Sequence, residues 1–426
     1  MTEALQILYG DTAVGTLAHD RRKDAITLTY DNAWRFSHDA FPVSLALPLT
    51  RGIHADDSIR PFLQGLLPDN PAMLEAWGKR FQVSPRNPFD LIKHVGEDCA
   101  GALQFVRPER LERILSGELD SLTPLNEEDM EKRMAALHSQ ARAVPVEIEG
   151  RFSLAGAQTK DALYQRDGKW FVPGGRIPST HILKPEIDEF EHHALNEHFC
   201  LQLAAEAGLM RARSEVLEIG GKQVLCVKRY DRTMDPDGTI IRWHQEDTCQ
   251  ATGRYPNQKY QSDGGASAAE IAMLLEQYSD DRQDDVRRFI MALALNWVIA
   301  GTDAHSKNYS LLHGPGNFLR LAPFYDLASW LPYERDTHST KVKLAMKIGG
   351  SYRLHEIDGK RWRKWAEEAG QDPLWVMACV EALVNQVAGA VDKVREAIAE
   401  THDTRFLHDL AGRIKDRVEA CQSRLG

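Results

Sequence analysis

The apolar run Phe289–Ala300, followed at once by the polar loop Gly301–Tyr309, constrains the fold of this chain more than any other segment. The run is apolar on every face, which predicts a helix buried at the centre of a helix-rich lobe. A stiff, buried element fixes the position of the residues that directly follow it. We therefore expect the polar side chains of the loop to be held in a defined geometry.

The loop carries Asp303 and Asn308 five residues apart, and Asp326 follows 23 residues after Asp303. Phosphoryl-transfer enzymes use this spacing. One carboxylate accepts the proton of the attacking hydroxyl, while an amide oxygen and a later carboxylate hold Mg²⁺ against the nucleotide phosphates. We therefore interpret Asp303 as the catalytic base and Asn308 and Asp326 as metal ligands. The alternative for Asp303 and Asn308 is a loop of helix-capping residues.

Two further side chains in the loop carry a charge or can acquire one. His305 is expected to line the metal or phosphate pocket, although a single histidine is more often structural. Lys307 is expected to neutralise charge on the transferred phosphoryl group.

A second group of residues, upstream of the loop, suits the nucleotide phosphates. Ala155-Gly156-Ala157 carries almost no side chain, so its backbone can approach a phosphate closely, although the same residues also suit an ordinary tight turn. The segment lacks the Walker pattern of a P-loop. Lys184 ends an apolar strand in the place where a kinase lysine reaches the phosphates, and Glu197 on the following helix would orient it. The alternative for Glu197 is a solvated helix face.

Composition narrows the classes of protein further. The chain has 426 residues, of which 43% are hydrophobic and 27% charged, and its net charge is −10. These values are typical of a soluble protein of two or three domains and argue against one built chiefly to bind nucleic acid. There is no signal-peptide pattern and no run of about 18 apolar residues, so we expect no membrane span. The six scattered cysteines predict reduced, mostly buried thiols.

The order of predicted elements divides the chain into two domains. Residues 1–148 are expected to form an accessory α/β domain and its connection to the second domain. Strands are predicted at Leu5–Tyr9 and Ala25–Tyr30, and helical segments at Pro61–Pro68 and Pro88–Val95. The charged segment Pro108–Val144 is predicted to be mostly helical.

Residues 149–426 are predicted to form a catalytic domain, with a small lobe at about 149–235 and a helical large lobe at about 236–426. The small-lobe elements are strands at Asp161–Tyr164, Thr180–Lys184 and Val224–Lys228 and a helix within Glu189–Gly208. The predicted fold class is therefore α+β, with two lobes as in protein kinases and an N-terminal accessory α/β domain.

Short motifs in a fixed order resemble the HipA family of serine/threonine kinase toxins from bacterial toxin–antitoxin pairs, and the resemblance covers nearly the whole chain. The motifs are Ser44–Leu49, Phe62–Asn70 and Gly96–Leu103 in the first domain, and Ser153–Lys160, Thr180–Lys184, Arg229–Arg232, Gln245–Ala251, Asp303–Asn308 and Pro323–Asp326 in the second. The metal-binding loop of this chain ends in Tyr325-Asp326-Leu327-Ala328 rather than in the Asp-Phe-Gly of eukaryotic protein kinases, and no His-Arg precedes Asp303.

The resemblance implies a HipA-like fold and assigns ATP contacts beyond those proposed from spacing. Gln158 and Lys160 would belong to the phosphate loop, and Lys184 would bind the ATP phosphates. The main chain around Lys228 and Tyr230 would hold the adenine.

The resemblance also implies a regulatory role for Ser153. Kinases of this family phosphorylate the matching serine on themselves, after which the phosphate loop is expelled and activity is lost. A phosphate dianion at the mouth of the site would compete with ATP electrostatically. The alternative is that Ser153 is an ordinary turn residue.

Partners and localisation follow from the same resemblance. It implies a cytoplasmic toxin that phosphorylates a cellular protein, best known among such targets being aminoacyl-tRNA synthetases, and so inhibits translation and growth. The implied partner is a HipB-like helix-turn-helix antitoxin, with operator DNA contacted only through that complex. Arg361–Trp365 and Arg413–Arg417 are candidate basic surfaces for this contact, or solvated helix faces.

Two alternatives to a protein kinase stay open. The first is a catalytically weak kinase-fold protein that acts as an antitoxin partner or co-repressor. The second is a lipid kinase like the phosphatidylinositol kinases, which is disfavoured because no basic amphipathic segment suited to a membrane surface is evident.

Overall fold

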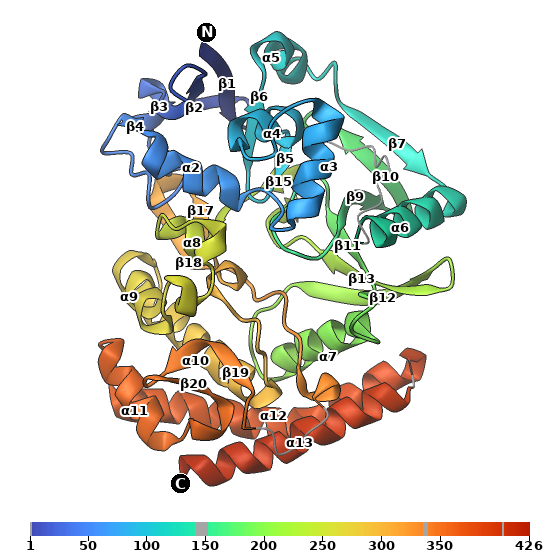
Figure 1. Cartoon of the computed structure of the whole chain (residues 1–426), viewed down its shortest axis with the longest axis vertical. Coiled ribbons are helices and arrows are strands. Elements are labelled where there is room, and N and C mark those ends of the chain that lie inside the picture. Colours follow the sequence, from blue (N-terminus) through green and yellow to red (C-terminus); the bar gives the residue numbers. More distant parts are fainter. Residues whose placement is uncertain (1, 142–151, 335–339, 403) are drawn as a thin grey trace. The chain divides into compact units, whose positions relative to one another are not determined.

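A computed structural model describes residues 2–141, 152–334, 340–402 and 404–426 (Figure 1). The chain forms two compact units. Unit 1 comprises residues 1–185, 217–257 and 312–318, and unit 2 comprises residues 186–216, 258–311 and 319–426. The predicted boundary between residues 148 and 149 lies outside the described residues.

The first sheet of unit 1 is antiparallel, in the order β4-β3-β2-β1-β6. Its strands are β1 (Thr2–Tyr9), β2 (Thr12–Asp20), β3 (Ala25–Tyr30), β4 (Ile53–His54) and β6 (Leu103–Val106). Burial alternates along β3, where Ile26, Leu28 and Tyr30 are buried, as expected for a strand with one face on a core. The strands predicted at Leu5–Tyr9 and Ala25–Tyr30 are therefore confirmed.

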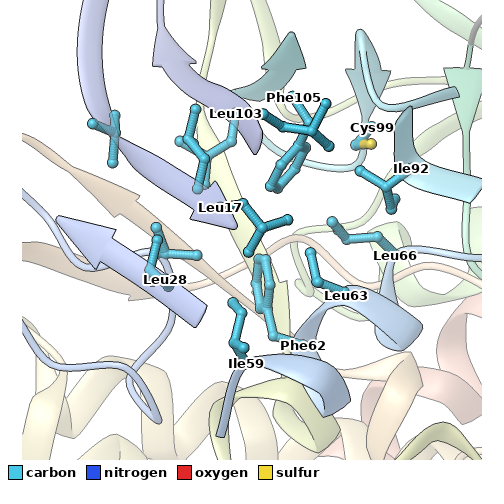
Figure 2. Close-up of a cluster of buried hydrophobic side chains, with 14 of the residues drawn as sticks. Leu17, Leu28, Ile59, Phe62, Leu63, Leu66, Ile92, Cys99, Leu103 and Phe105 are labelled. Atoms are coloured by element: carbon cyan, nitrogen blue, oxygen red, sulfur yellow. The ribbon is translucent and has the colours of Figure 1, made fainter. Parts of the chain in front are cut away.

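Helices cover the apolar face of this sheet (Figure 2). The helices of this part of the chain are α1 (Asn32–Arg35), α2 (Asp56–Gly65), α3 (Pro71–Phe81) and α4 (Pro88–Val95). Leu17 and Leu28 from the sheet pack with Phe62 and Leu66 from the α2 region and with Ile92 of α4. The helices predicted at Pro61–Pro68 and Pro88–Val95 are both present, and the first extends from Asp56 to Gly65.

The second sheet has the order β12-β13-β11-β9-β10-β7 and lies in unit 1 apart from residues 213–216 of β12. Its strands are β7 (Ser121–Leu125), β9 (Asp161–Arg166), β10 (Lys169–Gly174), β11 (His181–Pro185), β12 (Arg213–Ile219) and β13 (Lys222–Lys228). Met130, Met134 and Leu137 of α6 (Glu127–Ala141) pack on Leu163 and Leu183 of the sheet. The strands predicted at Asp161–Tyr164, Thr180–Lys184 and Val224–Lys228 are confirmed with small shifts of their ends.

The prediction that Pro108–Val144 is mostly helical was wrong in the middle of the segment. Helices α5 (Pro108–Leu115) and α6 are present, but Ser121–Leu125 forms β7 and pairs antiparallel with β10. A sheet edge offers unpaired backbone groups, and pairing with it outweighs the weak local preference of this polar stretch.

The remaining strands, and the one-turn helix α8, are short. They are β5 (Asp98–Cys99), β8 (Phe152–Ser153), β14 (Arg232–Met234), β15 (Ile240–Arg242), β16 (His244–Asp247), α8 (Thr248–Ala251), β17 (Ser310–Gly314), β18 (Phe318–Leu321), β19 (Lys343–Ile348) and β20 (Ser351–Arg353). Of these, β5 and β8 pair in parallel and bring Ser153 opposite Cys99.

Unit 2 is mainly helical. Its helices are α7 (His193–Glu206), α9 (Ala268–Tyr278), α10 (Arg282–Ile299), α11 (Gly359–Glu368), α12 (Pro373–His402) and α13 (Arg405–Leu425). Every residue of α10 from Phe289 to Ile299 is buried, and the helix packs against α9, α12 and α13. The prediction of a buried central helix is confirmed, and α7 confirms the helix expected within Glu189–Gly208.

Helix α12 is long and apolar enough to cross a membrane by length and composition alone. Half of its most apolar window is buried within the protein, and the helix packs against α7, α10, α11 and α13. A core helix of a soluble protein has this pattern. The sequence reasoning had not singled out this helix, because scattered polar residues interrupt its apolar run.

All six cysteines are buried free thiols, as predicted. Burial raises the pKa of the Cys99 thiol to about 12 and that of Cys421 to about 11. These thiols therefore stay protonated at neutral pH and behave as small apolar side chains.

Candidate active site

The predicted catalytic loop, residues 301–309, begins where α10 ends in a sharp turn. Ala300 adopts the left-handed conformation with φ of 53°, and the amide of Gly301 donates to the carbonyl oxygen of Asn296 at 2.8 Å. A Cβ atom on Gly301 would lie 2.0 Å from Asn296 Oδ1. Only glycine fits this position, and the helix stops at one defined residue.

Side chains from other elements bind the carbonyl groups that α10 leaves free at its end. Ser329 Oγ donates to the carbonyl of Ile299 at 2.6 Å, and Arg417 Nη2 donates to that of Trp297 at 2.9 Å. The last carbonyls of a helix have no partner within the helix, so such bonds fix its end in place. The start of the catalytic loop is therefore anchored on several sides.

Asp303 is the exposed member of a loop whose following residues are buried. Asp303 Oδ1 accepts a hydrogen bond from the Tyr260 hydroxyl. Ser306 binds the carbonyl of Lys259 twice, from its amide at 3.2 Å and from its hydroxyl at 2.8 Å. No side-chain hydrogen bond caps the short 3-10 helix at 306–308. Capping therefore does not account for the Asp303 carboxylate.

His305, Lys307 and Asn308 are each less than a tenth exposed. His305 meets the ring of Tyr260 edge-on, with ring centroids 5.0 Å apart. A buried lysine and a buried asparagine in a loop this short place charge and polar atoms where water is largely excluded, which strengthens their interactions.

Asp326 lies on a segment that is tied to the catalytic loop. The Tyr325 hydroxyl donates to the carbonyl of Lys307 at 2.7 Å and shares a 2.6 Å hydrogen bond with Ser310 Oγ. These two residues flank Asn308 in the sequence. Asp326 itself adopts a left-handed backbone with φ of 52°, an uncommon conformation that is often found at functional sites.

The donor set of Asn308 and Asp326 suits Mg²⁺. Magnesium prefers oxygen ligands and is commonly held by one or two carboxylates together with the phosphates of the substrate. One amide oxygen and one carboxylate match this requirement. Among the described residues no group of three or more His, Cys, Asp and Glu side chains could hold a metal by itself.

The phosphate loop Ser153–Lys160 lies in unit 1. Gly156 has φ of +117°, and a Cβ atom there would lie 2.5 Å from Lys160 Nζ. Lys160 Nζ donates to the carbonyl of Ala155 at 2.6 Å. The ammonium group therefore lies directly against the backbone of the residue triplet 155–157, where a positive charge would also serve a bound phosphate.

The backbone and side chains of this loop form hydrogen bonds with two other segments of unit 1, one that follows α2 and one at the end of β11. Ser153 is fully buried, and its hydroxyl donates to the carbonyl of Leu66 at 2.7 Å. The Asp69 amide donates to the carbonyl of Gly156 at 3.0 Å. Gln158 Nε2 donates to the carbonyl of Pro185 at 2.9 Å. Ser153 is thus no ordinary exposed turn residue.

Lys184 lies on β11 next to the position that Gln158 contacts. Its neighbour Leu183 faces the apolar core, so the alternation of the strand directs Lys184 to the opposite face. Lys184 is only 5% exposed. The structure therefore brings Lys184 and the phosphate loop together within unit 1.

A buried cluster of charges holds the chain segment after β13. Arg229 pairs with Asp231 at 2.8 Å, and Asp98 pairs with Arg232 at 3.2 Å and with Arg242 at 2.9 Å. Burial opposes ionisation of Asp98, but the neighbouring arginines outweigh it and hold its pKa below the ordinary value. This cluster links the first predicted domain to the segment that carries Lys228 and Tyr230.

The side chains at this segment make different contacts. Lys228 is exposed, whereas the Tyr230 hydroxyl donates to Gln245 Oε1. The amide of Arg229 donates to the carbonyl of Thr180 at 2.9 Å. The backbone next to Tyr230 is thereby bound to Thr180, the residue directly before β11.

Glu197 on α7 is 2% exposed, so the interpretation as a solvated helix face is wrong. Three arginines of the two basic segments bind main-chain carbonyls within unit 2. The pairs are Arg361 with Glu356 and Gly349, Arg413 with Leu331 and Glu334, and Arg417 with Trp297. These contacts favour a structural role for the segments.

Sequence reasoning did not single out Tyr260 or Lys259. Both residues lie in a polar stretch without apolar periodicity. Tyr260 precedes Asp303 by 43 residues. The signal that could have found them is a tyrosine and a glycine pair, Gly264-Gly265, in an otherwise irregular segment.

Comparison with known proteins identifies the family. The family model of the HipA-like C-terminal domain matches residues 152–397, and that of the HipA N-terminal domain matches residues 5–106. This chain belongs to the HipA family. The matched ranges carry the phosphate loop and Lys184 as well as Asp303, Asn308 and Asp326.

Relatives of this HipA-family protein are named as kinases. The Sinorhizobium fredii protein Y4mE, named as a candidate kinase, is 37% identical over 96% of this chain and 97% of its own length. The serine/threonine-protein kinase toxin HipA of Shewanella oneidensis is 30% identical over 84% of this chain and 81% of its own length.

A solved structure shows the same fold. It is HipA of the Shewanella oneidensis toxin–antitoxin system in complex with HipB and its operator DNA, and it matches with a TM-score of 0.83. The match covers 98% of this chain and 97% of that chain at 25% sequence identity. The fold of this HipA-family chain is therefore the predicted two-lobed, kinase-like α+β fold.

Proposed function

We propose that this chain is an ATP- and Mg²⁺-dependent serine/threonine protein kinase that acts as the toxin of a toxin–antitoxin pair. The observation that carries this proposal is the arrangement in unit 2, where Asp303 and Asn308 share one anchored loop and hydrogen bonds from Tyr325 tie the segment of Asp326 to it. A base and two oxygen ligands on connected, immobilised segments are what phosphoryl transfer requires.

Asp303 acts as the base in the proposed reaction. The substrate hydroxyl oxygen forms a bond to the γ-phosphorus of ATP, the bond from that phosphorus to the bridging oxygen breaks, and ADP leaves. The hydroxyl proton passes to the Asp303 carboxylate, whose exposed position leaves it open to a protein substrate. Lys307, buried beside Asn308, offsets the charge on the transferred phosphoryl group.

Asn308 and Asp326 would hold Mg²⁺, which when bound neutralises charge on the β and γ phosphates. Lys184 and the loop residues Gly156 and Lys160 would hold the phosphates. These assignments rest on the buried position of Lys184 and on the closeness of Lys160 Nζ to the Gly156 backbone. The main chain around Tyr230 would hold the adenine.

The proposed kinase inactivates itself by phosphorylating Ser153. In the structure Ser153 is buried and bound to Leu66, so its hydroxyl can be phosphorylated only after the loop leaves this position. A phosphate dianion does not fit a buried site that offers a carbonyl oxygen as its partner. Phosphorylation would therefore keep the loop out and lower the affinity for ATP.

The biological role is proposed from the relatives. The name of the Shewanella oneidensis relative and its structure with HipB and operator DNA support a HipB-like helix-turn-helix antitoxin as partner. Operator DNA would be contacted through that complex. We propose a cytoplasmic protein target, an aminoacyl-tRNA synthetase being the first to examine, whose phosphorylation inhibits translation and growth.

Incubation of the purified protein with γ-labelled ATP, Mg²⁺ and a bacterial lysate tests the proposal. We expect label on Ser153 and on a lysate protein. The Asp303→Asn variant should lose at least about a hundredfold in rate, the lower end of what a general base contributes. Asp235→Asn, a change in an exposed turn, serves as the matched control.

Other outcomes of this experiment contradict the proposal in distinct ways. Label found only in lipid vesicles containing phosphatidylinositol would identify a lipid kinase. No label on any protein or lipid, from a folded sample that still binds a HipB-like antitoxin, would identify a non-catalytic partner protein.

A further inference from the structure

The segment 259–261 lies against the catalytic loop and contacts it at consecutive residues. The Lys259 carbonyl accepts both hydrogen bonds from Ser306. The Tyr260 hydroxyl donates to Asp303 Oδ1, and the Tyr260 ring packs edge-on against His305 at an interplanar angle of 83°. All of these residues belong to unit 2.

The segment is itself held rigidly. The Tyr260 carbonyl accepts from the amides of Asp263 and Gly265, both at 2.9 Å. A Cβ atom on Gly265 would lie 2.4 Å from the carbonyl oxygen of Gln258, so the turn closes only around glycine. Gln261 Oε1 accepts from the amide of Lys347 on β19 at 2.7 Å. A turn fastened in this way can hold another group in place.

We propose that Tyr260 is a positioning residue for Asp303. This inference rests on the proposed kinase function and extends it to a residue that no catalytic motif contains. Asp303 is exposed, and an exposed aspartate without a fixed partner is free to change rotamer. The phenol holds Oδ1 and thereby directs the second oxygen, Oδ2, toward the hydroxyl that is to be deprotonated.

The Tyr260→Phe variant tests this role, because it removes the hydroxyl and keeps the ring that contacts His305. We expect kcat to fall about tenfold to a hundredfold, the range that one hydrogen bond to a charged group is worth, with KM for ATP unchanged. Tyr278→Phe, the same chemical change at a half-exposed residue of α9, should leave kcat unaltered.

A second measurement does not depend on kinase activity. The χ1 couplings of Asp303, measured by NMR on selectively labelled protein, should indicate one rotamer in the parent and an average over rotamers in Tyr260→Phe. A single Asp303 rotamer in both proteins, or a kcat equal to that of the parent, would overturn the inference. If the parent protein itself transfers no phosphate, the proposed function fails, and the couplings still decide whether Tyr260 positions Asp303.

Discussion

The phosphate loop and the catalytic loop are both polar loops beside stiff elements, but they are held in different ways. The catalytic loop follows the buried end of α10 and is braced by the turn at 259–261 and by Tyr325. The phosphate loop begins in the two-residue strand β8, which pairs with β5, and is otherwise held by hydrogen bonds such as those from Ser153 to Leu66 and from Asp69 to Gly156. Under the proposed function, the chemistry would reside on a fixed loop and the regulation on a releasable one.

The strongest test of this difference is the variant Ser153→Asp. An ionised carboxylate without a positive partner is costly to bury, so the phosphate loop should leave its site and kinase activity should fall to the level of Asp303→Asn. The melting temperature should fall only modestly, because release of the loop breaks the short β5–β8 ladder and a few hydrogen bonds and leaves the two sheets of unit 1 paired.

Ser37→Asp, at an exposed position of the same unit, is the control for added charge and should keep full activity. If Ser153→Asp retained parental activity, the buried position of Ser153 would have no bearing on catalysis.

The variant Gly301→Ala tests the fixed loop. Its Cβ atom would meet Asn296 Oδ1 at 2.0 Å, and overpacking of this kind costs about 1–3 kcal/mol in the free energy of unfolding. Stability by denaturant titration and kinase activity should fall together, in contrast to Ser153→Asp. Gly389→Ala in α12, where a new Cβ meets nothing within 4 Å, should instead stabilise the helix by about 0.5–1 kcal/mol. A Gly301→Ala protein with parental stability and activity would show that the loop is not rigidly held.

Acid should weaken unit 1, which carries the phosphate loop. Burial, and then the neighbouring His313, lower the pKa of His244 to about 3. Below the ordinary histidine pKa the unfolded chain binds a proton that the folded chain does not. The free energy of unfolding is therefore unaffected at pH 7 and falls as the pH drops below about 6.5, by about 2 kcal/mol at pH 5.

Denaturant titration at several pH values checks this effect. His244→Gln keeps a donor for the Val43 carbonyl and should show a shallower decline in stability between pH 7 and pH 5. An equal slope for the two proteins would rule out His244 as a source of the acid sensitivity.

The smallest expected effect is that of Ser153→Ala. It removes the hydrogen bond to Leu66, which is worth about 1 kcal/mol, and leaves a carbonyl without that donor. We expect activity within a few-fold of the parent and no self-inactivation during prolonged incubation with ATP. A Ser153→Ala protein that still inactivates itself would place the regulatory phosphate elsewhere.

The sequence predicted the parts of the site that depend on local order. The buried helix at Phe289–Ala300, the strand that ends near Lys184 and the loop that follows α10 are all present, because periodicity and glycine placement determine them over short distances. The assignments of Asp303, Asn308 and Asp326 to catalysis stay predictions, now with a structure that ties their segments together.

The contacts that the sequence did not predict join residues far apart in the chain. Ser153 and Leu66 are 87 positions apart, and Tyr260 and Asp303 are 43 apart. Such pairs arise from the packing of whole elements, and no local pattern encodes them. The strand β7 was missed for the same reason, since its partner β10 lies more than 40 residues further along the chain.

Hydrogen–deuterium exchange, measured before and after incubation with ATP and Mg²⁺, tests the account most directly. The mass of each peptide shows whether it carries a phosphate, and its deuterium uptake shows how well its amides are protected. We predict one phosphate on Ser153, faster exchange across residues 153–160, and unchanged slow exchange across residues 301–309. Absence of phosphate, or an equal rise in exchange in both loops, would contradict a kinase with a fixed catalytic loop and a releasable phosphate loop.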